Sequence, residues 1–309
     1  MRKSNLTIFL FFLSLTGLLG QQFPILDNYL INPSSISPAF TGKYYKFQTI
    51  LTHRSEWTKL SGAPVIGNIN LDGQLAKNIG LGGNILINKA GRVKNLTFNL
   101  NFAYHLQVAA DHFLSFGINA ACYQNSIDLT DLLVSDPTDP LLTGGDKITE
   151  TYFNVGASLL YNWRDLNFCI SFPLLFNNNS FYSGSSYDRI LTMDRNWLLY
   201  ANYAVNVSPD WRLKFDFLFR NTQFSSWTID LSTLVNYKDN YWFGLMYRKN
   251  NILGVTAGLS IIKSIILNYN YEFNGFAMQG LGGGTHEISI GYRIKSSETK
   301  PLQIKDYAN

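Results

Sequence analysis

The chain has 309 residues, of which 15% are aromatic and 15% are charged, with a formal net charge of +4. Removal of a leader over residues 1–20, which carries two basic residues, leaves a formal charge of about +2. This balance excludes nucleic-acid binding driven by charge, so we expect no nucleic-acid partner. No stretch after residue 20 is long and apolar enough for a membrane-spanning helix.

The N-terminus is typical of a secretory signal peptide. Arg2 and Lys3 form a basic start, residues 6–15 are apolar, and Gly20 suits cleavage. An uncleaved anchor helix is the alternative, but the apolar stretch is short for a bilayer. We therefore expect four parts: a signal peptide at 1–20, an N-terminal periplasmic or luminal segment at 21–44, a barrel at 45–295 and a polar periplasmic tail at 296–309.

A two-residue alternation of apolar and polar side chains dominates the chain after this segment. It is clearest at Leu96, Phe98, Leu100, Phe102, Tyr104 and Leu106, which alternate with polar or small residues. Successive side chains on a strand point to opposite faces, so one face of this strand is apolar. Repeated use of such strands, with large aromatic residues on the apolar face, is typical of a barrel with lipid outside and a polar lumen.

Similar stretches follow one another to the C-terminus and predict about 14 strands of roughly ten residues. The predicted strands are 45–54, 64–71, 79–88, 96–107, 113–124, 152–163, 166–172, 197–207, 211–220, 227–236, 241–248, 253–262, a strand including 265–273, and 285–295. The fold class is therefore an all-β, transmembrane, antiparallel up-and-down barrel with an N-terminal periplasmic or luminal segment.

The lengths of the connections agree with this assignment. If the first strand starts in the periplasm, connections after even-numbered strands are short and those after odd-numbered strands face outside. The connections after even-numbered strands are tight, for example 109–112 and 164–165, and rich in turn-forming residues. The longest connections, 125–150 and 173–196, follow odd-numbered strands. We therefore expect an outer-membrane location with both termini periplasmic.

Tryptophan and cysteine residues are consistent with such a wall. Five tryptophans lie at or near predicted strand ends, where an interfacial aromatic girdle belongs; they are Trp163, Trp197, Trp211, Trp227 and Trp242. Cys122 and Cys169 each lie in a predicted strand. A disulfide is possible in an exported protein, but two small hydrophobic wall residues is the favoured interpretation.

Signals for chemistry are weak, so we expect no enzymatic activity and no cofactor. The run 280–285 lacks the lysine of a phosphate loop, and the four histidines form no arrangement with serine and acid. Asp136, Asp139 and Asp146 lie in an acidic connection where a calcium site is conceivable, although the spacing matches no EF-hand loop. A solvated loop is favoured, and the connection remains a candidate contact surface. Gly80 and Gly82 lie within a strand, where glycine marks a kink or a crowded position.

A charged pair beside an indole follows the first strand. Arg54, Glu56 and Trp57 are placed where that strand leaves the membrane. They either order the following loop, which we favour, or meet a partner. On the strand 211–220 the polar face mixes positive and negative side chains, so it predicts no simple ion selectivity.

Several fragments occur in an order that is similar to one family. Ser37-Pro38-Ala39-Phe40-Thr41-Gly42 occupies the place of an Asn-Pro-Ala-aromatic-small-Gly turn, and Arg54-Ser55-Glu56-Trp57 with Pro64 occupies that of an Arg-x-Gln-Trp element. The fragments Gly80-Leu81-Gly82, 102–106, 114–118 and 286–290 follow. Across the whole mature chain they resemble the PorP/SprF family of outer-membrane proteins. Ser37 and Glu56 depart from the family pattern.

The resemblance implies a role in type IX secretion and gliding motility in the Bacteroidota. It implies a non-enzymatic barrel that anchors a secreted adhesin or other type IX cargo and contacts periplasmic anchoring or type IX components as well as membrane lipid. Pro38, Phe40 and Gly42 become candidate structural or partner contacts. A passive channel or hydrophobic-solute transporter is the alternative. We expect residues 21–42 to pack inside or beneath the barrel.

Overall fold

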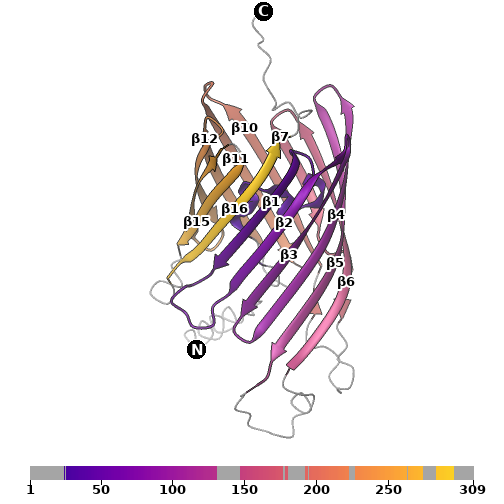
Figure 1. Ribbon diagram of the computed structural model, residues 1–309, viewed down its shortest axis with the longest axis vertical. Helices are drawn as coiled ribbons and strands as arrows, with labels where there is room; N and C mark the ends of the chain where they lie inside the picture. The colour runs from indigo at the N-terminus through magenta and orange to yellow at the C-terminus, as the bar shows by residue number, and fades with distance from the viewer. Residues whose placement is uncertain are drawn as a thin grey trace, which may run out of the picture.

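The computed structural model describes residue 24 and residues 26–130, 147–176, 178–179, 192–193, 195–222, 227–262, 264–273 and 283–295. Within these residues the chain forms a closed antiparallel barrel of 14 strands (Figure 1). Each strand pairs with its neighbour along the chain, and β16 closes the wall against β1. The predicted fold class is therefore confirmed.

The strand bounds follow the sequence alternation closely. The barrel strands are β1 Tyr45–Ser55, β2 Val65–Ala76, β3 Ile79–Ala90, β4 Val93–Ala109, β5 His112–Asp128, β6 Lys147–Trp163, β7 Leu166–Phe172, β10 Asn196–Asn206, β11 Trp211–Thr222, β12 Thr228–Tyr237, β13 Tyr241–Arg248, β14 Ile252–Ile261, β15 Ile265–Phe273 and β16 Thr285–Lys295. A separate two-stranded sheet joins β8 Asn178–Asn179 to β9 Thr192–Met193.

The two faces of the wall differ as the alternation predicts. On β1, Leu51 is 53% exposed and the next residue, Thr52, is 4% exposed. On β4, Leu100 is exposed and Asn101 is buried. Large apolar side chains thus cover the outside of the wall, while asparagine, serine and threonine face the lumen, an arrangement that suits lipid outside the barrel.

The two ends of the barrel are unlike. Short turns join β2 to β3, β4 to β5, β6 to β7, β10 to β11, β12 to β13 and β14 to β15 at one end, which we name the turn end. The other end, where β1 stops, is named the loop end. β1 starts and β16 stops at the turn end, which is uppermost in Figure 1.

Three neighbouring strands are longer than the sequence predicts. β4, β5 and β6 have 17 residues each, whereas β7 has only 7. The apolar alternation stops near Gln124, but pairing between β5 and β6 continues to Asp128 and Lys147. Beyond the apolar band the outward side chains become polar, so the hydrophobic pattern could not mark where these strands end.

The prediction for the cysteines is confirmed, whereas the prediction for the tryptophans is wrong for one residue. Both cysteines are free thiols, as favoured. Trp163, Trp197, Trp211 and Trp227 lie at strand ends, but Trp242 does not belong to a girdle. Its side chain points into the lumen, is 9% exposed and donates from Nε1 to Asn268 at 2.6 Å. Trp242 is the second residue of β13 and therefore faces opposite to the outward Tyr241.

Among the described residues, the model contains no helix with the length and apolar character needed to cross a bilayer.

Candidate functional site

A segment of the chain that precedes the first strand lies inside the barrel. Residues 26–44, here named the luminal segment, form three 3₁₀ turns: η1 Asp27–Leu30, η2 Pro33–Ser35 and η3 Pro38–Phe40. Pro33 and Pro38 each open a turn, where the fixed φ of proline suits the geometry and its missing N–H is not needed. This placement agrees with the expectation that residues before the barrel pack within it.

The luminal segment runs from the loop end to the turn end. Asp27 contacts Arg54, the second-to-last residue of β1, at the loop end. The N–H of Gly42 donates to Asp72, near the end of β2, at 2.9 Å. The chain then turns into β1, which travels back in the opposite direction. The first described residues and the start of the wall therefore lie at opposite ends of the barrel.

Buried charges hold the segment at the loop end. We name them the luminal charge cluster: Asp27, Arg54, Asp230, Arg248, Glu272 and Glu287. The Asp27 carboxylate accepts from Arg54 at 2.9 Å and from Arg248 at 2.8 Å. Its backbone N–H donates to Glu287 at 2.9 Å. Asp27 thus joins the segment to three strands, β1, β13 and β16.

The remaining members of the luminal charge cluster satisfy one another. Arg54 donates to Glu272 at 2.6 Å and to Glu287 at 3.2 Å. Arg248 donates to Asp230 at 2.9 Å and also to Glu272. Charged groups withdrawn from water need close partners of opposite sign, and each of these groups has at least one. These ion pairs join β1, β12, β13, β15 and β16 at the loop end of the barrel.

The pKa of Asp27 shows which influence prevails. Burial acts to raise the pKa of its carboxyl, but the positive charges of Arg54 and Arg248 outweigh burial and lower the pKa to about 2. Asp27 is therefore ionised at physiological pH, which favours its ion pairs with both arginines.

Cationic side chains hold the other end of η1. Lys214 on β11 donates to the carbonyl oxygen of Leu30 at 2.7 Å, and Arg293 on β16 donates to that of Ile31 at 2.7 Å. These carbonyls have no partner within the turn, and positive charge beside them is favourable. η1 is therefore fixed between opposite parts of the wall.

A polar network connects the middle of the segment to β1 and β2. Asn32 donates to Asn70 at 3.1 Å and accepts from Gln48 at 2.8 Å. Ser34 donates to Asp72 at 2.9 Å. Buried polar side chains require such partners, and here both members of each pair are buried.

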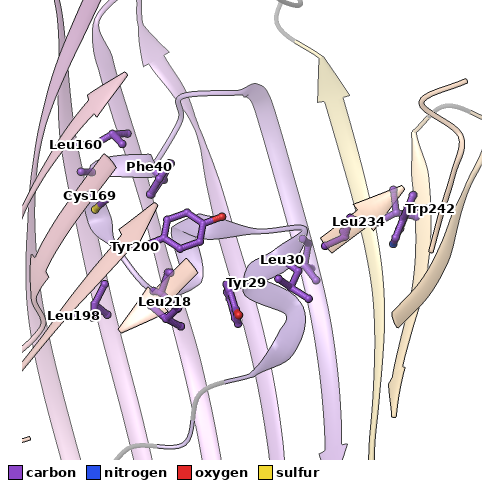
Figure 2. Packing of buried hydrophobic residues seen from close by; sticks show 14 residues of the cluster. Tyr29, Leu30, Phe40, Leu160, Cys169, Leu198, Tyr200, Leu218, Leu234 and Trp242 are labelled. Atoms are coloured by element: carbon purple, nitrogen blue, oxygen red, sulfur yellow. The ribbon is translucent and has the colours of Figure 1, made fainter. Parts of the chain in front are cut away.

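Apolar side chains of the luminal segment pack against inward residues of the wall. Tyr29, Leu30 and Phe40 of the segment belong to one buried cluster with inward residues of β1, β6, β7, β10, β11, β12, β13 and β15. Figure 2 shows Tyr200 between Tyr29 and Phe40. Its ring lies 6.0 Å from that of Tyr29 and 5.8 Å from that of Phe40, both edge-on. A continuous core therefore crosses the inside of the barrel.

Wall glycines make room for the segment near the turn end. A Cβ atom added at Gly80 would overlap the carbonyl oxygen of Thr41, and one at Gly117 would overlap the backbone of Ala39. Nearby, Ser158 accepts from the N–H of Ala39 at 2.9 Å. Gly80 was expected at a kink or a crowded position, and the backbone of the luminal segment is what crowds it.

The predicted contact residues have different outcomes. Pro38, Phe40 and Gly42 are buried in the luminal segment. Arg54 does pair with Glu56, at 2.9 Å, but its guanidinium also contacts Asp27, Glu272 and Glu287 inside the barrel. Trp57 opens the turn after β1, with φ +44° and an N–H donated by Leu60 to its carbonyl. Asp136, Asp139 and Asp146 lie outside the described residues.

Most of the luminal charge cluster could not be recognised from the sequence. Asp230, Arg248, Glu272 and Glu287 are each only one polar residue in an alternating stretch, and Asp27 precedes the first strand. One feature of the sequence could have indicated the cluster: charged residues recur at inward positions near the loop ends of β12, β13, β15 and β16. Pairing them required knowing that these strands meet around one lumen.

Metal ligands and histidine contacts were compared among the described residues. No group of three histidine, cysteine, aspartate or glutamate side chains among them is placed to hold a metal ion. His105 contacts the hydroxyl of Ser115 at 2.8 Å, but its other nitrogen meets the carbonyl oxygen of Thr41 and not a carboxylate. This pair therefore lacks the acid of a hydrolytic triad.

Solved structures share the fold at low sequence identity. The Ralstonia pickettii toluene transporter TbuX has a TM-score of 0.54 and 11% identity, with 90% of this chain and 95% of that chain covered. The CymD monoaromatic hydrocarbon channel has a TM-score of 0.52 at 11% identity, covering 90% and 95%. A Pseudomonas aeruginosa FadL homologue has a TM-score of 0.50 at 11% identity, covering 89% and 95%. At this identity the likeness concerns the fold alone.

The family comparison covers nearly the whole chain. No curated protein matches the sequence. Residues 18–292 match the family described as type IX secretion system membrane protein PorP/SprF, a range that includes the luminal segment and almost all of the wall. Together with the closed barrel and its apolar outer surface, this supports an outer-membrane location. The chain belongs to the PorP/SprF family of type IX secretion system membrane proteins.

Proposed function

We propose that this protein is a non-enzymatic docking component of a type IX secretion system in the outer membrane. In this role it retains a secreted surface protein, such as an adhesin, at the loop end and contacts periplasmic anchoring or secretion components at the turn end. The observation that carries the proposal is the buried core that the luminal segment forms with inward side chains of the wall. This core occupies part of the lumen and leaves the two ends of the barrel as the surfaces for binding.

The proposed orientation follows from the connections. Bacterial barrels have short periplasmic turns and longer outer loops, so the turn end faces the periplasm and the loop end faces outside. Tyr45 and Lys295 then lie on the periplasmic side, as expected for the two ends of the wall. Leu26 lies toward the outer side of the lumen, because the luminal segment crosses the barrel before β1 begins.

The loop end supplies the proposed cargo surface. The connection from β5 to β6 and the connection from β7 to β10 both leave the barrel there. The long strands β5 and β6 carry the first of these connections well beyond the end of β7. A rigid hairpin that projects from the wall is a suitable platform for a large exported protein. The portions 131–146 and 180–191 of these connections lie outside the described residues.

A loop-replacement experiment tests the docking role. Residues 131–146 and, separately, 180–191 are replaced by a Gly-Ser linker, and surface retention of secreted proteins is measured in intact cells. The control carries an epitope in the turn 238–240 at the opposite end. We expect loss of a type IX cargo protein in at least one replacement, with the barrel still folded by its mobility on unheated gels. Full retention in both replacements contradicts the cargo surface.

A second experiment tests the partners directly. The full protein is purified from native membranes in a gentle detergent, and the associated proteins are identified by mass spectrometry. We expect a large secreted protein with a type IX sorting domain, or a periplasmic anchoring protein. Repeated recovery of the barrel alone, in good yield, contradicts the docking role.

A passive channel is the second candidate, because the structural neighbours include a hydrocarbon channel and a toluene transporter by name. The luminal segment weighs against it, since solutes would need to pass a buried apolar core and a paired charge cluster. Single-channel recording in planar bilayers separates the two functions. Docking predicts no steady conductance, whereas a stable open state in the intact protein favours the channel.

The absence of enzymatic activity is part of the same proposal. It is supported by the engagement of the buried carboxylates in ion pairs and by the carbonyl partner of His105. Assays of the purified protein on lipid, ester and peptide substrates test it. Turnover that resists removal by further purification contradicts it.

A further inference from the structure

Two lysines stand side by side on the outside of the barrel. Lys89 on β3 and Lys94 on β4 are directly opposite in the strand register, two residues below the tip of their hairpin. Both side chains are exposed. Directly opposed residues on one face have Cβ atoms about 5 Å apart, and like charges in this arrangement destabilise a sheet. The protein thus carries an unfavourable pair at this position.

The pair lies at the border of the apolar band. On β3 the outward residues before Lys89 are Ile85 and Ile87, which are 41% and 42% exposed. On β4 the outward residue Phe98 is 44% exposed, and Leu96 lies between it and Lys94. Because alternate residues share a face, the two lysines continue these apolar rows toward the loop end. They are therefore placed at the level of lipid headgroups.

Among the described residues, no acidic side chain is directly opposite either lysine. The same row is completed by Val65 on β2 and Ser126 on β5, which are both uncharged. Among the described residues, no carboxylate forms an ion pair within 4.0 Å of either lysine. The acid next in register, Asp128, is opposite Lys147.

A third cation lies at the hairpin tip. Arg92 is exposed and follows Gly91, whose φ of +56° forms the turn. One of its nitrogens donates to the carbonyl oxygen of Thr130, which ties the hairpin tip to the end of β5. The guanidinium is thereby held at the end of β5, where the backbone N–H of Asp128 also donates to the carbonyl oxygen of Arg92. Three positive charges within six residues, above an apolar surface, match a negatively charged headgroup with acyl chains beneath it.

We propose that Lys89 and Lys94, assisted by Arg92, bind the phosphate group of an outer-leaflet glycolipid of the lipid A type. The phosphate lies between the two ammonium groups and relieves their repulsion, while the acyl chains lie against Ile85, Ile87 and Phe98. This inference goes beyond the proposed docking role and shares with it only the orientation of the barrel. Its test therefore succeeds or fails separately from the search for cargo.

The test uses the full protein in a nonionic detergent and three probes: diphosphorylated lipid A, dephosphorylated lipid A and inorganic phosphate. Binding is measured by native mass spectrometry and by the shift of the melting temperature. The test variant is K89Q/K94Q. The matched control is K46Q/K238Q, which removes the same charge from exposed lysines at the turn end.

We expect diphosphorylated lipid A to bind the intact protein and the control variant alike. Each lysine beside an anionic lipid contributes roughly fivefold in affinity, so K89Q/K94Q should bind about 25-fold more weakly. K89R/K94R, which keeps the charge, should retain most of the affinity. In detergent without lipid, K89Q/K94Q should be at least as stable as the intact protein, because the repulsion is removed.

Three results would overturn the inference. The first is equal binding of lipid A by K89Q/K94Q and the control. The second is equal binding of the dephosphorylated lipid by the intact protein, since the phosphate would then contribute nothing. The third is an equal stabilisation by inorganic phosphate at the same concentration, which would assign the pair to free phosphate and not to a lipid.

Discussion

The thiol of Cys169 on the inner face of β7 lies 3.2 Å from the hydroxyl of Ser37 in the luminal segment. Cys169 is fully buried, so the segment covers it.

In a Cys122→Ser background, we expect a maleimide to leave Cys169 unlabelled in the folded protein. Deletion of residues 26–40 should allow labelling through the lumen. The fraction of labelled Cys169 is measured by mass spectrometry after timed exposure to the maleimide. Protein unfolded by heating in sodium dodecyl sulfate gives the value for full labelling. Rapid labelling of the intact protein would show that the segment does not rest on β7.

Asp27→Asn should loosen the segment without changing its shape. The change removes the negative charge that faces both Arg54 and Arg248 inside the barrel. Breaking one partner of a buried ion pair costs about 3–5 kcal/mol. We therefore expect a lower melting temperature and intermittent conductance in planar bilayers.

Asp111→Asn is the matched control for this charge change. Its partner Arg164 is 56% exposed at the turn end, and exposed pairs contribute only about 0–1 kcal/mol. Its melting temperature should stay close to that of the intact protein. If both variants lost the same stability, the luminal charge cluster would not be what attaches the segment.

A pair of glycine substitutions separates crowding at the segment from the general effect of a side chain in a strand. Gly80→Ala should destabilise the barrel by about 1–3 kcal/mol, because the new methyl group meets the backbone of Thr41. Gly67→Ala has open space around it and should change stability by no more than about 0.5 kcal/mol. Thermal unfolding followed by gel mobility measures both. Equal effects would mean that the segment can shift to accommodate the methyl group.

Acid should release the segment, and the direction follows from the pKa of Asp27. Its folded pKa is about 2, below the ordinary value of 3.8, because the two arginines outweigh burial. Such a group stabilises the folded arrangement above pH 4, and this contribution is lost as pH falls from about 4 toward 2. Conductance should therefore rise as the pH falls from about 4 toward 2. Asp27→Asn, which cannot titrate, should lack this rise.

The strands of the wall could be predicted from the sequence because the alternation of inward and outward side chains depends only on neighbouring residues. Leu51 and Thr52 alternate faces wherever they are placed in a barrel, so strand number, faces and turn positions follow from neighbouring residues alone. The ends of β4, β5 and β6 were underestimated because main-chain pairing continues where the outward side chains become polar. Trp242 was misassigned because it lies near a strand end but on the inward side of the alternation.

The interior could not be predicted in the same way. Asp27 and Glu287 are separated by 260 positions in the chain and meet only because the barrel closes. The sequence around Asp27 and around Glu287 does not indicate that the two residues are in contact. The resemblance of Pro38, Phe40 and Gly42 to a family turn did mark part of the segment, and Gly80 marked a crowded position. The contact between the two required the folded structure.

The partners of Asp27 also constrain the order of assembly. They lie on β1, β13 and β16, and the pairing of β16 with β1 is the last that the chain, read from its N-terminus, can form. The segment therefore cannot reach its full set of ion pairs until the ring of strands is complete. The same ion pairs thus join the two ends of the wall and the segment between them. A defect in closure should therefore weaken the attachment of the segment, and a displaced segment should weaken closure.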